Sequence, residues 1–251
     1  MMVSLIDKSV VITGSASGMG AASAREFAES GANVTIVDIN EKLAKQVADE
    51  ISAENPIIGD VGNSNFCNEV IEITIQRYGS IDVLVNCAGT ILRADSEDTT
   101  DAEWERVMST NVNGVFFMSR AAIGPMKKRS KGVIINFGSI WGSVGSPGVV
   151  AYCASKGAVH QITRAMALDH AKDGIRINAV CPGEVNTPML SSGRKSPPTQ
   201  KDLQKLADET IPMARLAEPE EVAKVVVFLA SDDSSYMTGS MVTVDAGFTA
   251  R

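Results

Sequence analysis

The sequence predicts a doubly wound α/β fold, a parallel sheet with helices on both faces. The first observation is that short β-branched runs alternate with longer helical patterns, as in successive βαβ units. The second is that these runs are almost continuously apolar, which is typical of strands buried on both faces. The third is that no linker, repeat or shift in composition divides the 251 residues. We therefore expect a single domain over residues 1–251.

Five runs rich in Val and Ile carry the clearest strand signal, and the chain as a whole predicts a sheet of about seven strands. These runs are 10–12, 34–37, 83–85, 133–135 and 175–180. Helical patterns lie between them, at 21–29, 41–51, 65–77, 103–123 and 150–171. An irregular stretch at about 187–212 follows, with a short polar helix near 201–209. A long insertion at the carboxyl end of a strand is typical of a lid over a ligand site.

Charge and hydropathy exclude several classes of partner. Lys and Arg total 23 against 30 Asp and Glu, and the net charge of −7 opposes binding to nucleic-acid phosphates. No apolar run approaches the length of about 20 residues that spans a bilayer, and no signal-like segment opens the chain. The four cysteines and two histidines show no zinc-like spacing. We therefore expect a soluble cytoplasmic protein with no metal and with no nucleic-acid or membrane partner.

A glycine-rich turn joins the first strand to the first helix. Gly14, Gly18 and Gly20 follow the pattern G-x-x-x-G-x-G, with Ser17 and Met19 between them. Glycine permits a tight turn and a close backbone approach, and the N-terminus of a helix offers free N–H groups to a pyrophosphate. The spacing differs from the dinucleotide pattern G-x-G-x-x-G, and taken alone it also fits a purely structural turn.

An acidic residue stands where a dinucleotide would place its adenosine ribose. Asp38 ends the second strand, 24 positions after Gly14, and can accept hydrogen bonds from ribose hydroxyls while it repels a 2′-phosphate. Neither Ser15 nor Ile39 supplies a basic partner for such a phosphate. The alternative role for Asp38 is a helix cap, but Asn40 already suits that role. This pattern favours NAD over NADP.

Polar residues at later strand ends point to chemistry in the same crevice. Tyr152 stands four residues before Lys156 on an expected helix, so the two share a face, and a nearby ammonium lowers a phenol pKa. Ser139 follows the fifth strand and is suited to hydrogen-bond a substrate oxygen, whereas no G-x-S-x-G elbow makes it a nucleophile. Asn111 lies in the helix after the fourth strand, where a core amide that bends the helix is the alternative role.

These motifs together resemble the short-chain dehydrogenase/reductase family over nearly the whole chain. The matching segments are TGSASGMG at 13–20, Asp60-Val61, NCAG at 86–89, Asn111, Ser139, YCASK at 152–156, PGEVNT at 182–187 and the C-terminal SSYMTGSMVTVDAGF. The resemblance implies a Rossmann-type sheet, an NAD cofactor and a homotetramer. Cys87, where the family often has Asn, and Glu184 inside the PG motif are the two departures.

The resemblance also implies roles for individual residues. Tyr152 would be the acid–base, and Lys156 would lower its pKa and hold the nicotinamide ribose. Ser139 would position the reacting oxygen, and Asn111 would hold a water on the proton path. The residues expected to bind NAD, besides Tyr152 and Lys156, are Gly14, Ser17, Gly18, Met19, Gly20, Asp38, Ile39, Asp60, Val61, Asn86, Ala88, Gly89, Pro182, Gly183, Val185 and Thr187.

The expected function is hydride transfer between NAD and a secondary alcohol on a small polar molecule such as a sugar, polyol or hydroxy acid. Arg93, Trp141 and Glu184 are the expected substrate residues, and Arg194-Lys195 in the lid supplies two further cations. One alternative is a carbonyl reductase similar to 3-oxoacyl carrier-protein reductases, which share these motifs. An alternative of another class is a non-catalytic NAD-sensing scaffold on the same fold. The presence of Ser139, Tyr152 and Lys156 argues against the scaffold.

Overall fold

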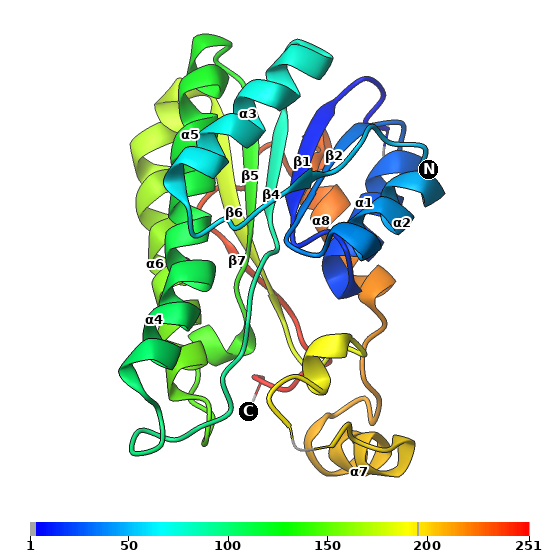
Figure 1. The fold of residues 1–251 in the computed structure, drawn as a ribbon, viewed down its shortest axis with the longest axis vertical. Coiled ribbons are helices and arrows are strands. Elements are labelled where there is room, and N and C mark those ends of the chain that lie inside the picture. The colour runs from blue at the N-terminus through cyan, green and yellow to red at the C-terminus, as the bar shows by residue number, and fades with distance from the viewer. Residues whose placement is uncertain (1–3, 195, 251) are drawn as a thin grey trace.

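A single seven-stranded parallel sheet forms the centre of the molecule (Figure 1). The computed structural model describes residues 4–194 and 196–250. The strand order is β3-β2-β1-β4-β5-β6-β7, which reverses direction between β1 and β4 as in a doubly wound sheet. The strands are β1 (Ser9–Thr13), β2 (Asn33–Asp38), β3 (Ile57–Ile58), β4 (Val83–Asn86), β5 (Gly132–Phe137), β6 (Ile175–Pro182) and β7 (Met241–Val244). The predicted fold class is confirmed.

Helices cover both faces of this sheet (Figure 1). On one face lie α1 (Gly18–Glu29), α2 (Glu41–Glu50) and α8 (Pro219–Ala230). The other face carries α3 (Ser64–Tyr78), α4 (Asp101–Met108), α5 (Gly114–Lys128) and α6 (Val150–His170). Alternate residues of β1 enter opposite cores, since Val10 and Ile12 pack on the α1 side while Val11 packs on the α3 side. Because both faces are buried, the strands read as continuous apolar runs.

Two helical expectations are corrected by the structure. The expected single helix at 103–123 is α4 and α5 separated by a π-helical turn, η1 (Ser109–Asn113). A π turn adds one residue to the helical repeat, which the apolar periodicity of the sequence does not reveal. The second correction is α8, which the sequence analysis did not predict as a helix. Its signals were present, with Pro219 in the first turn and a capping box between Glu218 and Glu221.

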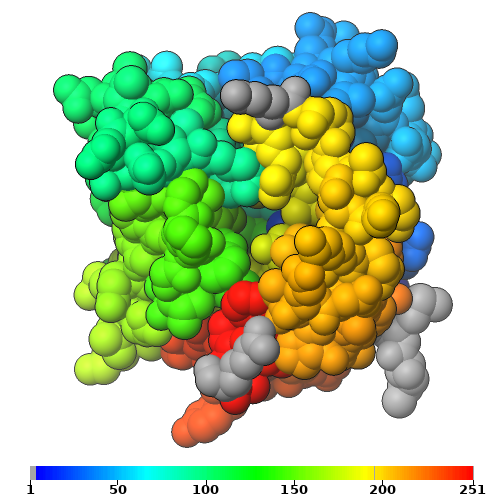
Figure 2. Space-filling view, turned by 90° about the horizontal axis from the view of Figure 1, so that it is seen from below, coloured from blue at the N-terminus to red at the C-terminus, as the bar shows by residue number. Residues whose placement is uncertain are grey.

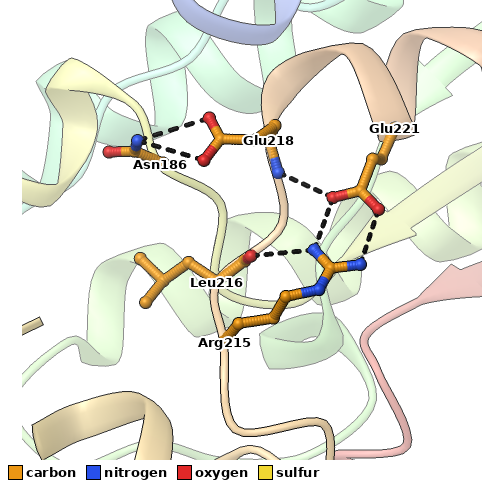
Figure 3. A network of polar contacts seen from close by, with 5 residues as sticks. All are labelled: Asn186, Arg215, Leu216, Glu218 and Glu221. Atoms are coloured by element: carbon orange, nitrogen blue, oxygen red, sulfur yellow. Dashed lines mark hydrogen bonds and ion pairs between the residues drawn. The ribbon is translucent and has the colours of Figure 1, made fainter. Parts of the chain in front are cut away.

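The expected lid leaves the sheet after β6 and contains η4 (Pro188–Leu190) and α7 (Gln200–Thr210). Its two stems are hydrogen-bonded to each other. The Asn186 N–H donates to the Ala217 carbonyl at 2.8 Å, and the Ala217 N–H donates to the Glu184 carbonyl at 3.1 Å. Beyond this pairing, both terminal nitrogens of Arg215 contact the Glu221 carboxylate at 2.7 Å (Figure 3). The lid is therefore anchored at both ends to the start of α8.

The carboxyl ends of the strands open toward this lid. Figure 2 views that end of the molecule and shows the yellow and orange lid facing the green chain across a hollow. Two neighbouring cavities lie there, of about 570 Å³ and 320 Å³, and both are lined by Met19, Thr187 and Met189. We call them the nucleotide cavity and the substrate cavity. The shared lining residues place the two cavities side by side.

Candidate active site

The glycine turn and the strand-end residues form the wall of the nucleotide cavity. The cavity has the size of a small-molecule site, and most of the residues expected to bind the cofactor line it. These are Gly14, Ser17, Gly18, Met19, Gly20, Asp38, Ile39, Asp60, Val61, Ala88, Gly89 and Thr187. The structure also places there Val37, Gly59, Cys87, Thr90, Arg106, Thr110, Pro188 and Met189, which the sequence analysis did not predict as cofactor residues. Most of these residues are neighbours of predicted strand-end residues, and this position in the sequence could have indicated them. Arg106 and Thr110 lie instead in α4 and in the π turn that follows it.

The glycines at this cavity are required by backbone contacts. A Cβ on Gly14 would lie 2.6 Å from the Cα of Ala88, and the φ angle of Gly14 is +66°. A Cβ on Gly20 would overlap the carbonyl oxygen of Gly14. Ser17 is the N-cap of α1, and its side chain makes no cap hydrogen bond. The N–H groups of the first helical turn therefore have no side-chain partner from the cap and no carbonyl of a preceding turn to bond. This cradle suits a pyrophosphate, whose charge favours a helix N-terminus.

Asp38 holds the glycine turn against β2. One carboxylate oxygen accepts from the Ala16 N–H and the other from the Asn40 N–H, both at 2.9 Å. Asn40 caps α2 by accepting from the Leu43 N–H, as expected. A carboxylate oxygen has more than one lone pair, so Asp38 retains the capacity to accept from a ribose hydroxyl. Ser15 is fully buried and bonded to the backbone of Val37, so it leaves no room for a basic side chain there.

Asn86 does not line the nucleotide cavity, unlike its neighbours in the turn. Its side chain is buried, and Nδ2 donates to Ser119 Oγ at 3.0 Å and to Asn136 Oδ1 at 2.9 Å. Asn136 in turn donates to Thr163 Oγ1 at 2.9 Å. The residue therefore ties β4 to β5 and α5. Its side chain therefore has a structural role, and cofactor binding by Asn86 stays a prediction.

The substrate cavity brings together residues that are far apart in the sequence. Ser139 follows β5, Tyr152 lies in the first turn of α6, and Pro182, Gly183 and Val185 come from the end of β6. The last three were expected to bind the cofactor, and the structure places them in this cavity, next to the nucleotide cavity. All three predicted substrate residues, Arg93, Trp141 and Glu184, also line it. The ring of Trp141 meets Phe248 edge-on at 5.3 Å.

The pKa of Tyr152 differs from the expectation. Burial raises the pKa of the Tyr152 phenol to about 12, and a hydrogen bond with Ser139 only partly opposes this. Lys156 was expected to lower this pKa, but within the chain its ammonium is not among the groups that shift it. The Lys156 Nζ lies 5.5 Å from the centre of the Tyr152 ring and donates to the Phe137 carbonyl at 2.7 Å. The i, i+4 spacing therefore predicted that Lys156 lies near Tyr152, but it did not predict that the pKa of Tyr152 is raised.

Lys156 is itself strongly perturbed. The side chain is 5 % exposed, and burial lowers the pKa of its ammonium to about 8. No carboxylate is among the groups that act on this pKa. A buried cation without a carboxylate partner is costly to the fold, and such perturbed groups cluster at functional sites.

Asn111 lies at the centre of the π turn and is fully buried. Its Oδ1 accepts from the Thr90 N–H at 2.8 Å, while Nδ2 donates to the Thr90 carbonyl and to Ser155 Oγ, both at 2.9 Å. Both amide protons are thus used by the protein. A water on a proton path would have to donate to an oxygen of Asn111. The amide joins the β4 turn to α6, so the core role weighed from the sequence is also present.

A buried histidine that the sequence analysis did not assign to the site lies behind Ser139. His160 Nε2 accepts from the Ser139 backbone N–H at 3.5 Å and lies 3.3 Å from Cys181 Sγ. Burial lowers the pKa of His160 to about 4, so the imidazole is neutral near pH 7. A Cβ on Gly138 or on Gly142 would come within 2.6 Å of this ring. The spacing of these two glycines around Ser139 was the available signal.

The described residues form neither a metal-binding cluster nor a membrane-spanning helix. Within residues 4–194 and 196–250, no three His, Cys, Asp or Glu side chains gather as they would around a metal ion. No helix in this described part is both long and apolar enough to cross a membrane.

A doubly wound sheet with a cavity at its switch point, beside a second cavity that holds Ser139 and a buried tyrosine, fits a nucleotide-dependent oxidoreductase. A family model described as enoyl-(acyl carrier protein) reductase matches residues 14–249. A structure of a short-chain type dehydrogenase/reductase from Mycobacterium marinum superposes with a TM-score of 0.92 and 33 % identity, covering 100 % of this chain and 98 % of that one.

Named relatives agree with this class. A cyclopentanol dehydrogenase from Comamonas testosteroni is 40 % identical, covering 98 % of each chain. A meso-2,3-butanediol dehydrogenase from Serratia marcescens is 40 % identical, covering 97 % of this chain and 95 % of its own. A 3-oxoacyl-[acyl-carrier-protein] reductase from Thermotoga maritima is 38 % identical, covering 96 % and 97 %. The chain belongs to the short-chain dehydrogenase/reductase family, and it is an oxidoreductase.

Proposed function

We propose that this oxidoreductase interconverts a secondary alcohol and its ketone on a small polar molecule, with NAD as the cofactor. The observation that carries the proposal is the convergence of Ser139 and Tyr152 in a cavity of about 320 Å³ next to the nucleotide cavity. A cavity of that size suits a small substrate. The names of the cyclopentanol and meso-2,3-butanediol dehydrogenases support this substrate class.

The proposed roles follow from the positions of the side chains. In alcohol oxidation the Tyr152 phenolate accepts the hydroxyl proton, and the Ser139 hydroxyl hydrogen-bonds the same oxygen. His160 holds the Ser139 backbone in place. Lys156 supplies a buried positive charge that favours the phenolate once both lie beside a ligand, and Asn111 orients the proton path through its oxygens. The nicotinamide, when bound, supplies the acceptor for the hydride.

The proposed cofactor is NAD because of the residues at the end of β2. Asp38 places a carboxylate at the cavity wall, and Ile39 beside it is 72 % exposed and uncharged. A 2′-phosphate at this position would meet the like charge of Asp38, and the neighbouring Ile39 supplies no cation to balance it. The pyrophosphate would lie on the N-terminus of α1, and Asp60 and Val61 would contact the adenine.

A substrate panel tests the proposal. Purified protein is mixed with NAD or NADP and with small secondary alcohols, diols, sugars and hydroxy acids, and nicotinamide reduction is followed by absorbance. We expect turnover with at least one small secondary alcohol and a higher kcat/KM with NAD. A strong preference for 3-oxoacyl thioesters and NADPH would instead favour the carbonyl reductase. NAD binding without turnover of any alcohol or ketone would support the non-catalytic scaffold.

We further propose a homotetramer in the cytoplasm. The two longest helical regions leave apolar side chains in solvent, with Leu168 82 % exposed and Phe116 and Val150 about 40 % exposed. Exposed apolar residues on helix faces are typical of contacts between symmetric copies. Sedimentation at assay concentration tests this, since a monomer would contradict it.

A further inference from the structure

Two arginines line the substrate cavity together with one carboxylate, that of Glu184. Arg93 comes from the loop after β4, and Arg194 comes from the lid. Neither lines the nucleotide cavity, so the phosphates of a dinucleotide there do not explain them. In the described part of the chain, neither forms an ion pair within 4.0 Å. Their charge at this place therefore needs another explanation.

Both guanidinium groups keep donors available. Arg93 Nε donates to the Ser192 carbonyl at 3.0 Å and Nη2 to the Met189 carbonyl at 3.4 Å. Arg194 Nε donates to the Leu190 carbonyl at 2.8 Å. A guanidinium has five N–H donors, so most of the terminal N–H groups have no acceptor within the described residues. The carbonyl contacts hold each side chain and leave most of its terminal N–H groups available to a ligand.

The electrostatics favour one added negative charge. Burial and the neighbouring Arg194 both lower the pKa of Arg93, which shows that the two cations act on each other. Glu184 is the carboxylate that acts on Arg93, and burial raises the pKa of Glu184 against the pull of both arginines. Asp202 also feels Arg194, but it is exposed and bonded to Thr199. Two cations and one carboxylate in the cavity leave a charge of about +1.

We propose that Arg93 and Arg194 form an anion subsite, so that the preferred substrate is a small secondary alcohol carrying one carboxylate or sulfonate group. This inference rests on the proposed function, because it names the substrate class of the same cavity. A guanidinium binds such groups through paired, charge-assisted hydrogen bonds. Glu184 disfavours a second negative charge, so a phosphate monoester, with a charge of about −1.5 to −2 at pH 7, binds less well.

Binding of anions that cannot react tests the subsite independently of catalysis. Calorimetry of the NAD-loaded protein uses butyrate, propane-1-sulfonate, propyl phosphate and neutral butyramide. We expect the two monoanions to bind at least tenfold more tightly than butyramide, and propyl phosphate to bind less tightly than they do. Arg93→Gln and Arg194→Gln should each weaken monoanion binding about ten- to a hundredfold and leave butyramide binding unchanged.

Glu184→Gln provides a test of opposite sign, since it removes the opposing charge and should tighten the binding of propyl phosphate more than that of butyrate. Arg25→Gln, on the outer face of α1, is the matched control and should leave the binding of all four ligands unchanged. Thermal melts show whether each variant is folded. If Arg93→Gln displaces the lid, the effect of Arg194→Gln on monoanion binding still tests the subsite. Equal binding of monoanions and butyramide by the wild type, or no change in both arginine variants, would overturn the proposal.

Turnover separates this proposal from the proposed function. We expect 3-hydroxybutyrate or 2-hydroxypropane-1-sulfonate to exceed 3-hydroxybutyramide in kcat/KM by tenfold or more. Turnover of the neutral alcohol alone would refute the anion subsite and retain the alcohol dehydrogenase. Monoanion binding that depends on both arginines, without turnover of any alcohol or ketone, would retain the subsite and refute the proposed function.

Discussion

The nucleotide cavity and the substrate cavity are adjacent, yet they are built from different parts of the chain. The first is built around a glycine turn, the N-terminus of α1 and the ends of β2, β3 and β4. The second depends on side chains, including Tyr152, whose pKa burial raises to about 12, and the charged group of Arg93, Glu184 and Arg194. The first cavity is therefore sensitive to added atoms, and the second to altered charge or proton affinity.

The largest expected effect is on the chemistry of the substrate cavity. Tyr152→Phe removes the proposed acid–base and should lower kcat by about 10²–10⁴-fold. NADH binding should largely remain, because the residues that line the nucleotide cavity, among them Gly14, Gly20 and Asp38, are unchanged. Stopped-flow or steady-state turnover with the best substrate measures the loss, and fluorescence titration measures NADH binding. If the variant keeps a third or more of the wild-type turnover, Tyr152 is not the acid–base.

The close backbone packing of the glycine turn predicts the next effect. Gly20→Ala would push a methyl group into the Gly14 carbonyl and should lower the free energy of unfolding by about 1–3 kcal/mol while weakening NAD binding. Gly124→Ala is the matched control, since it is also helical and its Cβ would have no neighbour within 4 Å. It should be neutral or should stabilise by up to about 1 kcal/mol. Equal effects in urea unfolding would contradict the comparison.

The buried ammonium predicts a conflict between activity and stability. Lys156→Met removes a charge whose pKa burial lowers to about 8, so it should raise the free energy of unfolding at pH 7 by about 1–3 kcal/mol while turnover falls. Below pH 8 Lys156 is protonated in both the folded and the unfolded protein, and the burial of its charge destabilises the folded state. Between about pH 8 and pH 10.5 only the unfolded chain keeps the proton, so the wild type gains stability as pH rises.

Urea unfolding of both proteins at pH 7 and pH 10 checks this sign. The advantage of Lys156→Met should shrink at the higher pH. An advantage that grows with pH would mean that the ammonium stabilises the fold and that its pKa is not lowered.

The smallest expected effect concerns the choice of cofactor. Asp38→Asn keeps the size of the side chain and an acceptor for the Ala16 or Asn40 N–H, but it removes the charge that would repel a 2′-phosphate. The ratio of kcat/KM for NAD over NADP should fall by about tenfold, which corresponds to about 1.4 kcal/mol. Asp60→Asn, elsewhere on the same cavity, should leave the ratio nearly unchanged. An equal change in both variants would exclude a specific role for Asp38.

The sequence alone determined the parts of this protein that depend on local pattern. Continuous Val and Ile runs alternating with helices specified the parallel sheet, because strands buried on both faces must be apolar throughout. The glycine spacing and Asp38 marked the nucleotide cavity, because close backbone approach and turn geometry restrict the residue type locally. The i, i+4 spacing placed Lys156 near Tyr152 for the same reason.

Only the tertiary structure decided the pKa values and the side-chain directions that depend on distant segments of the chain. Burial raises the pKa of Tyr152 and lowers that of Lys156, and burial is a property of the packed chain rather than of spacing. Asn86 lies in the same turn as Ala88 but points into the core, toward Ser119 and Asn136, and the residue types did not reveal this direction. His160 reaches Ser139 across 21 positions. The direction and desolvation of these polar side chains are set by neighbours distant in sequence, which the local patterns do not identify.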